Sequence, residues 1–97
     1  MIIEWLPKAR LELAAQLDHI ERDSLQAALT VARRVRDQAA QLAAFPELGR
    51  TGRKRGTREL VIGRTSLIVV YRVRPKLARL EIIRVLHSSQ QWPPEKS

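Results

Sequence analysis

Hydrophobic positions near the start of the chain repeat at helical spacing. After a short apolar run over 2–5, apolar residues recur every three or four positions, which predicts an amphipathic helix. The repeating residues are Leu6, Ala9, Leu13, Leu17 and Ile20. Pro7 fits the first turn of this helix, because a missing N–H costs nothing there. We therefore predict a strand over 2–5 and a helix that begins near residue 8.

A second apolar stripe with the same spacing follows a short polar break. Its members are Leu25, Ala28, Leu29, Ala32, Val35, Ala39 and Leu42. Asp23 and Gln26 have the spacing of a capping box, which predicts the start of a second helix. That helix ends before Pro46, because the residue preceding a proline resists the α region. The pattern predicts a helical hairpin over 8–44 with a turn of three or four residues.

The second half of the chain contains short runs typical of strands. We predict these strands over 58–62, 67–73 and 79–86, and the middle run is apolar on both faces, as in a covered central strand. Ahead of them, residues 49–56 hold three glycines and four cations, which predicts an irregular basic loop.

The predicted element order is β-α-α-β-β-β, an α+β fold. A helical hairpin packs on one face of a mainly antiparallel sheet. The 97 residues suit one domain over 1–97 with a single modest core. Residues 93–97 are expected to form a frayed tail.

Charge is distributed unevenly along this pattern. The chain carries 18 Lys or Arg and 10 Asp or Glu, a net charge of +8. Residues 48–97 hold 12 of the basic residues and only 3 acidic ones, whereas residues 1–47 hold 6 and 7. A small sheet carrying this many arginines favours an anionic partner, such as phosphate or an acidic protein.

Several classes of function are disfavoured by composition. The chain has no cysteine and two histidines, so disulfides, thiol catalysis and a metal site are not expected, and no cofactor is predicted. Glu4 stands where a signal peptide would be basic, and the longest apolar run, over 67–71, is too short to cross a membrane. We expect a cytoplasmic protein with no membrane role.

Short sequence motifs in the second half of the chain, in their order and spacing, resemble those of the RelE/ParE superfamily of bacterial toxins. The similarity is strongest over 49–93, in the words GTREL at 56–60, VYRV at 70–73, RVLH at 84–87 and QWP at 91–93. These proteins are the toxic halves of type II toxin–antitoxin pairs. The words are closer to those of the ParE branch, especially at RVLH.

The resemblance implies two kinds of target. RelE-like members are ribosome-dependent endoribonucleases that cut messenger RNA, and ParE-like members are described as poisons of DNA gyrase. In both branches a cognate antitoxin wraps the toxin in a hetero-oligomer and carries the pair to operator DNA. The resemblance therefore implies a growth-inhibiting toxin with an antitoxin partner, and ParE-like interference with gyrase is the favoured mode of action.

Ribonuclease chemistry would need a base, an acid and cations around the phosphate. The candidates for a metal-independent endoribonuclease are His87, Arg84, Arg58 and Glu59, since an imidazole titrates near neutrality. Trp92 could stack on a splayed base or close the edge of the core.

Two observations disfavour this chemistry. RelE-like ribonucleases often carry an arginine three residues before the tyrosine of the central strand, and this chain has Ile68 there. In a regular strand, Arg84 and His87 also point to opposite faces. The residues favour a non-enzymatic toxin, with the ribonuclease and a plain basic nucleic-acid-binding module as alternatives.

The expected surface for the target and the antitoxin lies on the basic loop and the sheet. Four cations in six loop residues repel one another, and an anionic partner would relieve that repulsion. The predicted binding residues are Arg50, Arg53, Lys54, Arg55, Arg58, Arg72, Arg84 and Trp92.

Overall fold

The computed structural model describes residues 1–94 and confirms the α+β fold. A two-residue strand, β2, is added inside the segment predicted as an irregular loop, because its backbone pairs with β3. The elements are β1 (Ile2–Trp5), α1 (Pro7–Glu21), α2 (Leu25–Ala40), the 3-10 turn η1 (Gln41–Ala43), β2 (Arg50–Thr51), β3 (Arg58–Val61), β4 (Leu67–Arg74), the 3-10 turn η2 (Pro75–Leu77) and β5 (Arg79–His87).

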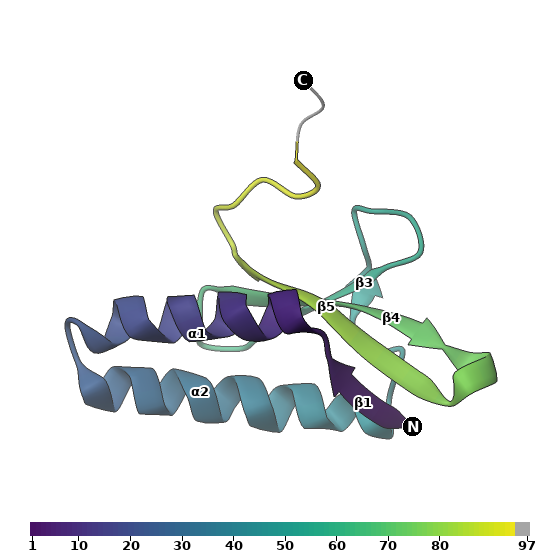
Figure 1. Ribbon diagram of the computed structural model, residues 1–97, viewed down its shortest axis with the longest axis horizontal. Helices are drawn as coiled ribbons and strands as arrows, with labels where there is room; N and C mark the ends of the chain where they lie inside the picture. Colours follow the sequence, from purple (N-terminus) through teal and green to yellow (C-terminus); the bar gives the residue numbers. More distant parts are fainter. Residues whose placement is uncertain (95–97) are drawn as a thin grey trace.

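The strands form one mixed sheet in the order β1-β5-β4-β3-β2. β1 runs parallel to β5, and all the other neighbours are antiparallel. The α1–α2 hairpin covers one face of this sheet (Figure 1). No helix in residues 1–94 is long and apolar enough to cross a membrane.

The main core lies between the hairpin and the sheet. Val35 and Ala39 of α2 pack there against side chains of the three long strands. The buried strand residues of this cluster are Leu60, Leu67, Val69, Tyr71, Leu80, Ile82 and Val85. The other face of the sheet carries a smaller cluster of Val70, Leu86 and Trp92. We call this second face of the sheet the outer face.

The start of α2 differs from the predicted capping box. Ser24 is the N-cap, and its Oγ accepts a hydrogen bond from the N–H of Ala27 at 3.1 Å. Asp23 lies one residue earlier, in the turn that ends α1, where its N–H bonds to the carbonyl of Ile20. Ser24 is the residue with the extended backbone that an N-cap requires.

Two leucines predicted to be buried on α2 are exposed. Leu25 and Leu29 keep 57% and 56% of their surface in solvent. The turn between the helices lies beyond the ends of the strands (Figure 1), so the first turns of α2 have no sheet beneath them. Helical periodicity records a stripe of apolar residues and says nothing of how far the sheet reaches under it.

Tyr71 fixes the segment that leads into the basic loop. Its ring is fully buried, and its hydroxyl donates to the carbonyl of Pro46 at 2.7 Å and accepts from the N–H of Gly49 at 2.8 Å. A Cβ on Gly49 would lie 2.7 Å from the Tyr71 ring, so only glycine fits this approach. Burial raises the pKa of Tyr71. The loop is therefore anchored to the central strand.

Candidate functional site

A β-bulge decides which residues of β5 reach the outer face. The register shifts between Val70 and Tyr71 of β4, so that Val70 pairs with Arg84 while Tyr71 pairs with Ile82. Beyond the bulge, Arg84 shares the outer face with Val70, and alternation places His87 on the helix side with Leu67. Arg84 and His87 therefore point to opposite faces, as the strand parity predicted.

Glu59 is the most deeply buried charge on the outer face. Its side chain has no exposed surface, and its carboxylate accepts the backbone N–H of Arg53 at 2.8 Å, Arg53 Nε at 3.2 Å and Arg50 Nη2 at 3.1 Å. Burial acts to raise the pKa of Glu59, but these hydrogen bonds outweigh it and hold the pKa below its ordinary value. Glu59 thus ties the basic loop to β3 and has no oxygen facing solvent to act as a base.

Arg84 is held by a carboxylate that the sequence did not single out. Glu12 of α1 accepts Arg84 Nε at 2.9 Å and Arg84 Nη2 at 2.7 Å, and it also accepts the N–H of Val85 at 3.0 Å. β1 pairs with β5 only as far as Ile82, so Glu12 continues that edge once β1 has ended. Nothing in the helical pattern distinguishes Glu12 from a solvated surface residue.

Trp92 covers the apolar part of the outer face. It is 8% exposed and packs with Val70 and Leu86. The guanidinium of Arg84 lies 4.7 Å from its ring centroid and the ammonium of Lys54 lies 5.7 Å away, which are cation–π distances. Trp92 therefore closes a second small core in this structure, and its ring is already in contact with two cations.

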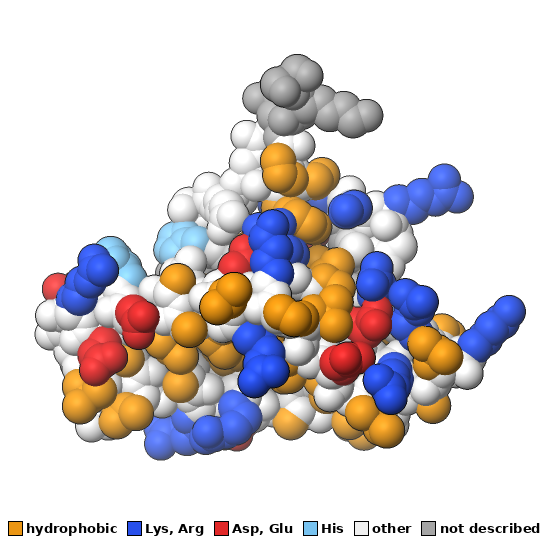
Figure 2. All heavy atoms as spheres, viewed as in Figure 1, with side chains coloured by type: hydrophobic (Ala, Val, Ile, Leu, Met, Phe, Trp, Pro, Cys, Tyr) orange, Lys and Arg blue, Asp and Glu red, His pale blue; other side chains and the backbone are white. Residues whose placement is uncertain are grey.

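Two further arginines of the sheet, Arg72 and Arg74, share one carboxylate. Glu81 accepts Arg72 Nε at 2.6 Å and lies 3.5 Å from Arg74 Nη1. The hydrogen bond from Arg72 lowers the pKa of Glu81. Red side chains lie among the blue ones on the face drawn in Figure 2. Most of the arginines expected from the sequence to form a bare cationic face are thus paired with carboxylates, and Glu59 and Glu81 each serve two of them.

Two loop cations and one sheet cation lack such a partner among residues 1–94. Lys54 and Arg55 are exposed in the basic loop and make no ion pair there. Arg58 pairs with Tyr71 across the strands, on the helix side of the sheet, and its Nη1 donates to the carbonyl of Gly49 at 2.8 Å. Lys54 also lies over the Trp92 ring, so Arg55 is the predicted binding cation with neither an ion pair nor a ring contact within residues 1–94.

The four ribonuclease candidates do not form one constellation. Arg84 and Glu59 lie on the outer face, whereas Arg58 and His87 lie on the helix side. His87 Nδ1 is 2.7 Å from Ser89 Oγ and accepts the N–H of Ser89 at 3.1 Å. No group of three or more residues that could hold a metal ion occurs within residues 1–94.

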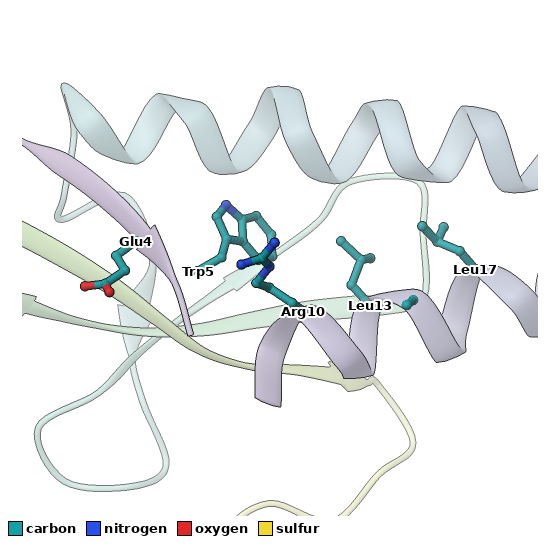
Figure 3. Close-up of a pocket in the computed structure, with 6 residues that line it drawn as sticks. Glu4, Trp5, Arg10, Leu13 and Leu17 are labelled. Carbon is teal, nitrogen blue, oxygen red and sulfur yellow. The ribbon is translucent and has the colours of Figure 1, made fainter. Parts of the chain in front are cut away.

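A separate apolar hollow lies between α1 and β1. It encloses about 640 Å³ and is lined by Trp5, Leu13 and Leu17, with Arg10 and Glu4 among its polar residues. In Figure 3, Leu13 and Leu17 point from α1 toward α2, and Arg10 lies beside the Trp5 ring. Trp5 lines this hollow and also packs against the main core.

This fold, with its arginine-rich outer face, is that of a toxin from a type II toxin–antitoxin system. Residues 3–92 match the family described as "ParE toxin of type II toxin-antitoxin system, parDE". The chain is 37% identical over 91 residues to "Putative toxin Y4kP" of Sinorhizobium fredii, covering 94% of this chain and 92% of that protein. The chain belongs to the ParE toxin family, within the RelE/ParE superfamily.

Solved structures agree with this assignment. The chain superposes with a TM-score of 0.78 on a protein of the "Chromosomal ParDE TA system from P. aeruginosa", at 27% identity, covering 90% of this chain and 95% of that one. A chain of the toxin–antitoxin complex RelBE2 from Mycobacterium tuberculosis shares the fold, with a TM-score of 0.57 at 20% identity, covering 89% and 95%.

The buried carboxylate predicts an acid-sensitive loop anchor. Because the pKa of Glu59 is lower in the folded chain than its ordinary value of 4.5, its stabilisation is present above that value and is lost as pH falls through the folded pKa. We expect Glu59→Gln to lower the free energy of unfolding by about 2 kcal/mol at pH 7, measured by urea denaturation.

The control is Glu21→Gln, at an exposed position of α1 that makes no ion pair within residues 1–94. It should change stability by less than about 0.5 kcal/mol. The deficit of Glu59→Gln should shrink as pH falls below about 4.5, because the carboxyl of the unfolded chain begins to take up a proton there and the folded carboxyl follows at lower pH. A deficit that stayed constant down to pH 3 would contradict this role of Glu59.

Proposed function

We propose that this chain arrests growth by binding DNA gyrase, as a protein–protein poison rather than as a nuclease. The observation that carries the proposal is the use of the outer-face groups. Glu59 and Arg84 are each engaged by protein partners, and His87 lies on the other side of the sheet. An RNA phosphate placed on this face would meet cations but no free base beside them.

Membership in the ParE family supports gyrase as the target, because the ParE branch resembled by this sequence is described as acting there. The surface also suits a protein partner. Lys54 and Arg55 project from a loop that Glu59 and Tyr71 hold in place, and a positioned charge pair steers association with an acidic surface.

We expect purified chain to inhibit DNA supercoiling by gyrase. The variant Lys54→Ala/Arg55→Ala should inhibit about tenfold less, since it loses two exposed cations from the proposed contact surface without removing a hydrogen bond to Glu59. The control Arg33→Ala/Arg36→Ala removes the same charge from the exposed side of α2 and should inhibit like wild type. The measurement is the concentration of chain that halves supercoiling.

Full supercoiling at a large molar excess of folded chain would contradict gyrase as the target. In that case, the same preparation is added to translating ribosomes and the transcripts are mapped at nucleotide resolution. Specific cleavage would support the ribonuclease alternative. Strongly salt-dependent binding to bare nucleic acid with neither activity would support the plain nucleic-acid-binding module.

We also propose a cognate antitoxin that pairs apolar anchors with carboxylates. The hollow between α1 and β1 offers apolar walls with Arg10 beside them, and the exposed loop cations Lys54 and Arg55 offer charge. A flexible segment that folds on binding can span both surfaces. The structural relatives come from systems described as toxin–antitoxin pairs, and operator binding is expected through the antitoxin.

Co-expression with the small gene adjoining that of this chain tests the antitoxin. We expect restored growth and a stable complex of the two proteins on gel filtration. The variant Leu13→Glu/Leu17→Glu, which places charges in the hollow, should fail to be rescued if it remains folded and toxic. Growth arrest by wild-type chain that persists with every adjoining small gene would contradict this partner.

A further inference from the structure

Both histidines of the chain line one pocket away from the outer face. It encloses about 340 Å³ where α1 meets β5 and the turn between β3 and β4. The apolar part of its lining is Ile20, Val31 and Leu67, and its rim carries His19, Arg64 and His87. The two pale blue side chains of Figure 2 lie on the same side of the molecule. Small-molecule sites combine an apolar wall with a few convergent polar groups in this way.

The charged and titratable groups that face the pocket are one cation and two imidazoles. α1 contributes His19, β5 contributes His87, the turn contributes Arg64, and α2 contributes only the apolar Val31. No carboxylate is among the residues that line it. The guanidinium of Arg64 makes no ion pair within residues 1–94. A pocket of this composition favours an anion.

Hydrogen bonding at His87 fixes which ring nitrogen can donate. The backbone N–H of Ser89 donates to Nδ1 at 3.1 Å, so Nδ1 acts as an acceptor. In the neutral ring the proton then resides on Nε2, which makes that nitrogen a donor. His87 therefore offers a hydrogen-bond donor in addition to the charge of Arg64.

Arg64 occupies a backbone conformation that ordinarily favours glycine. Its φ is +62°, in the left-handed region that non-glycine residues rarely adopt. α2 holds the turn in place, because Arg34 Nη1 donates to the carbonyl of Arg64 at 3.0 Å and Gln38 Oε1 accepts the N–H of Gly63 at 2.6 Å. The chain thus keeps a cation at a strained, well-supported position beside the pocket, a feature that clusters at functional sites.

We propose that this pocket binds a small organic oxyanion. Its phosphate or carboxylate group contacts Arg64, His19 and the Nε2–H of His87, and its apolar part packs against Ile20, Val31 and Leu67. The site is separate from the basic loop, so a test of ligand binding here does not depend on how the toxin acts.

The test uses the purified full chain and simple probes. Phenyl phosphate, benzoate, inorganic phosphate and phenol are titrated at constant ionic strength, with binding followed by calorimetry and by the histidine ring signals in NMR spectra. We expect one site per chain, and an aryl oxyanion that binds at least about tenfold more tightly than phenol or inorganic phosphate. The signals of His19 and His87 should shift together. The ratio of phenyl phosphate to benzoate affinity distinguishes a phosphate from a carboxylate ligand.

Arg64→Gly is the decisive variant. Because glycine suits the left-handed backbone, the melting temperature of the variant should equal or exceed that of the wild type. Its affinity for the aryl oxyanion should fall at least about tenfold. Arg33→Gln, which removes one charge from the exposed side of α2, should bind as wild type. Unchanged affinity in Arg64→Gly, equal loss in Arg33→Gln, or phenol binding as tightly as the oxyanions would overturn the proposal.

Discussion

Neutralisation of charge on the outer face is the constraint on which the rest of the structure depends. A small sheet that carries so many arginines repels itself unless carboxylates lie among them. Glu59 forms ion pairs with Arg50 and Arg53. Glu12 forms an ion pair with Arg84, and Glu81 forms ion pairs with Arg72 and Arg74. Each pair also joins two parts of the fold. Glu59 joins the basic loop to β3, and Glu12 joins α1 to the open edge of β5.

This constraint separates the cations by role. Those of the outer face are paired with carboxylates, and Arg84 also lies over Trp92. Lys54 and Arg55 lie exposed in an anchored loop and make no ion pair within residues 1–94. This separation is the basis of the proposed contact with a protein target. The pocket beside Arg64 lies outside this network.

Much of the fold could be predicted from the sequence, because the spacing of apolar residues and the positions of proline and glycine indicate helices, strands and turns. The helical stripes, the three long strands and the element order follow from spacing alone. The capping box at Asp23 was wrong, because Asp23 still belongs to the turn that ends α1 and the extended backbone of the N-cap falls on Ser24. Leu25 and Leu29 were wrongly placed in the core because the extent of the sheet beneath a helix is a tertiary property.

The site was less predictable, because its contacts join residues that are far apart in the sequence. The arginines, Glu59 and Trp92 could be named from composition and words, and strand parity separated Arg84 from His87. Glu12 could not be found, because it lies 72 residues from Arg84 in the sequence and on a helix it looks like any solvated acid. The neutralisation of the sheet was therefore invisible in a count of charges along the chain.

Exchange of arginine Nε protons, measured by NMR at neutral pH, tests this account most directly. The account predicts slow exchange for Arg53, Arg72 and Arg84, whose Nε–H groups are bonded to carboxylates, and fast exchange for Arg55. Uniformly fast exchange at all four arginines would contradict it, because the outer-face cations would then be free in solution rather than part of the fold.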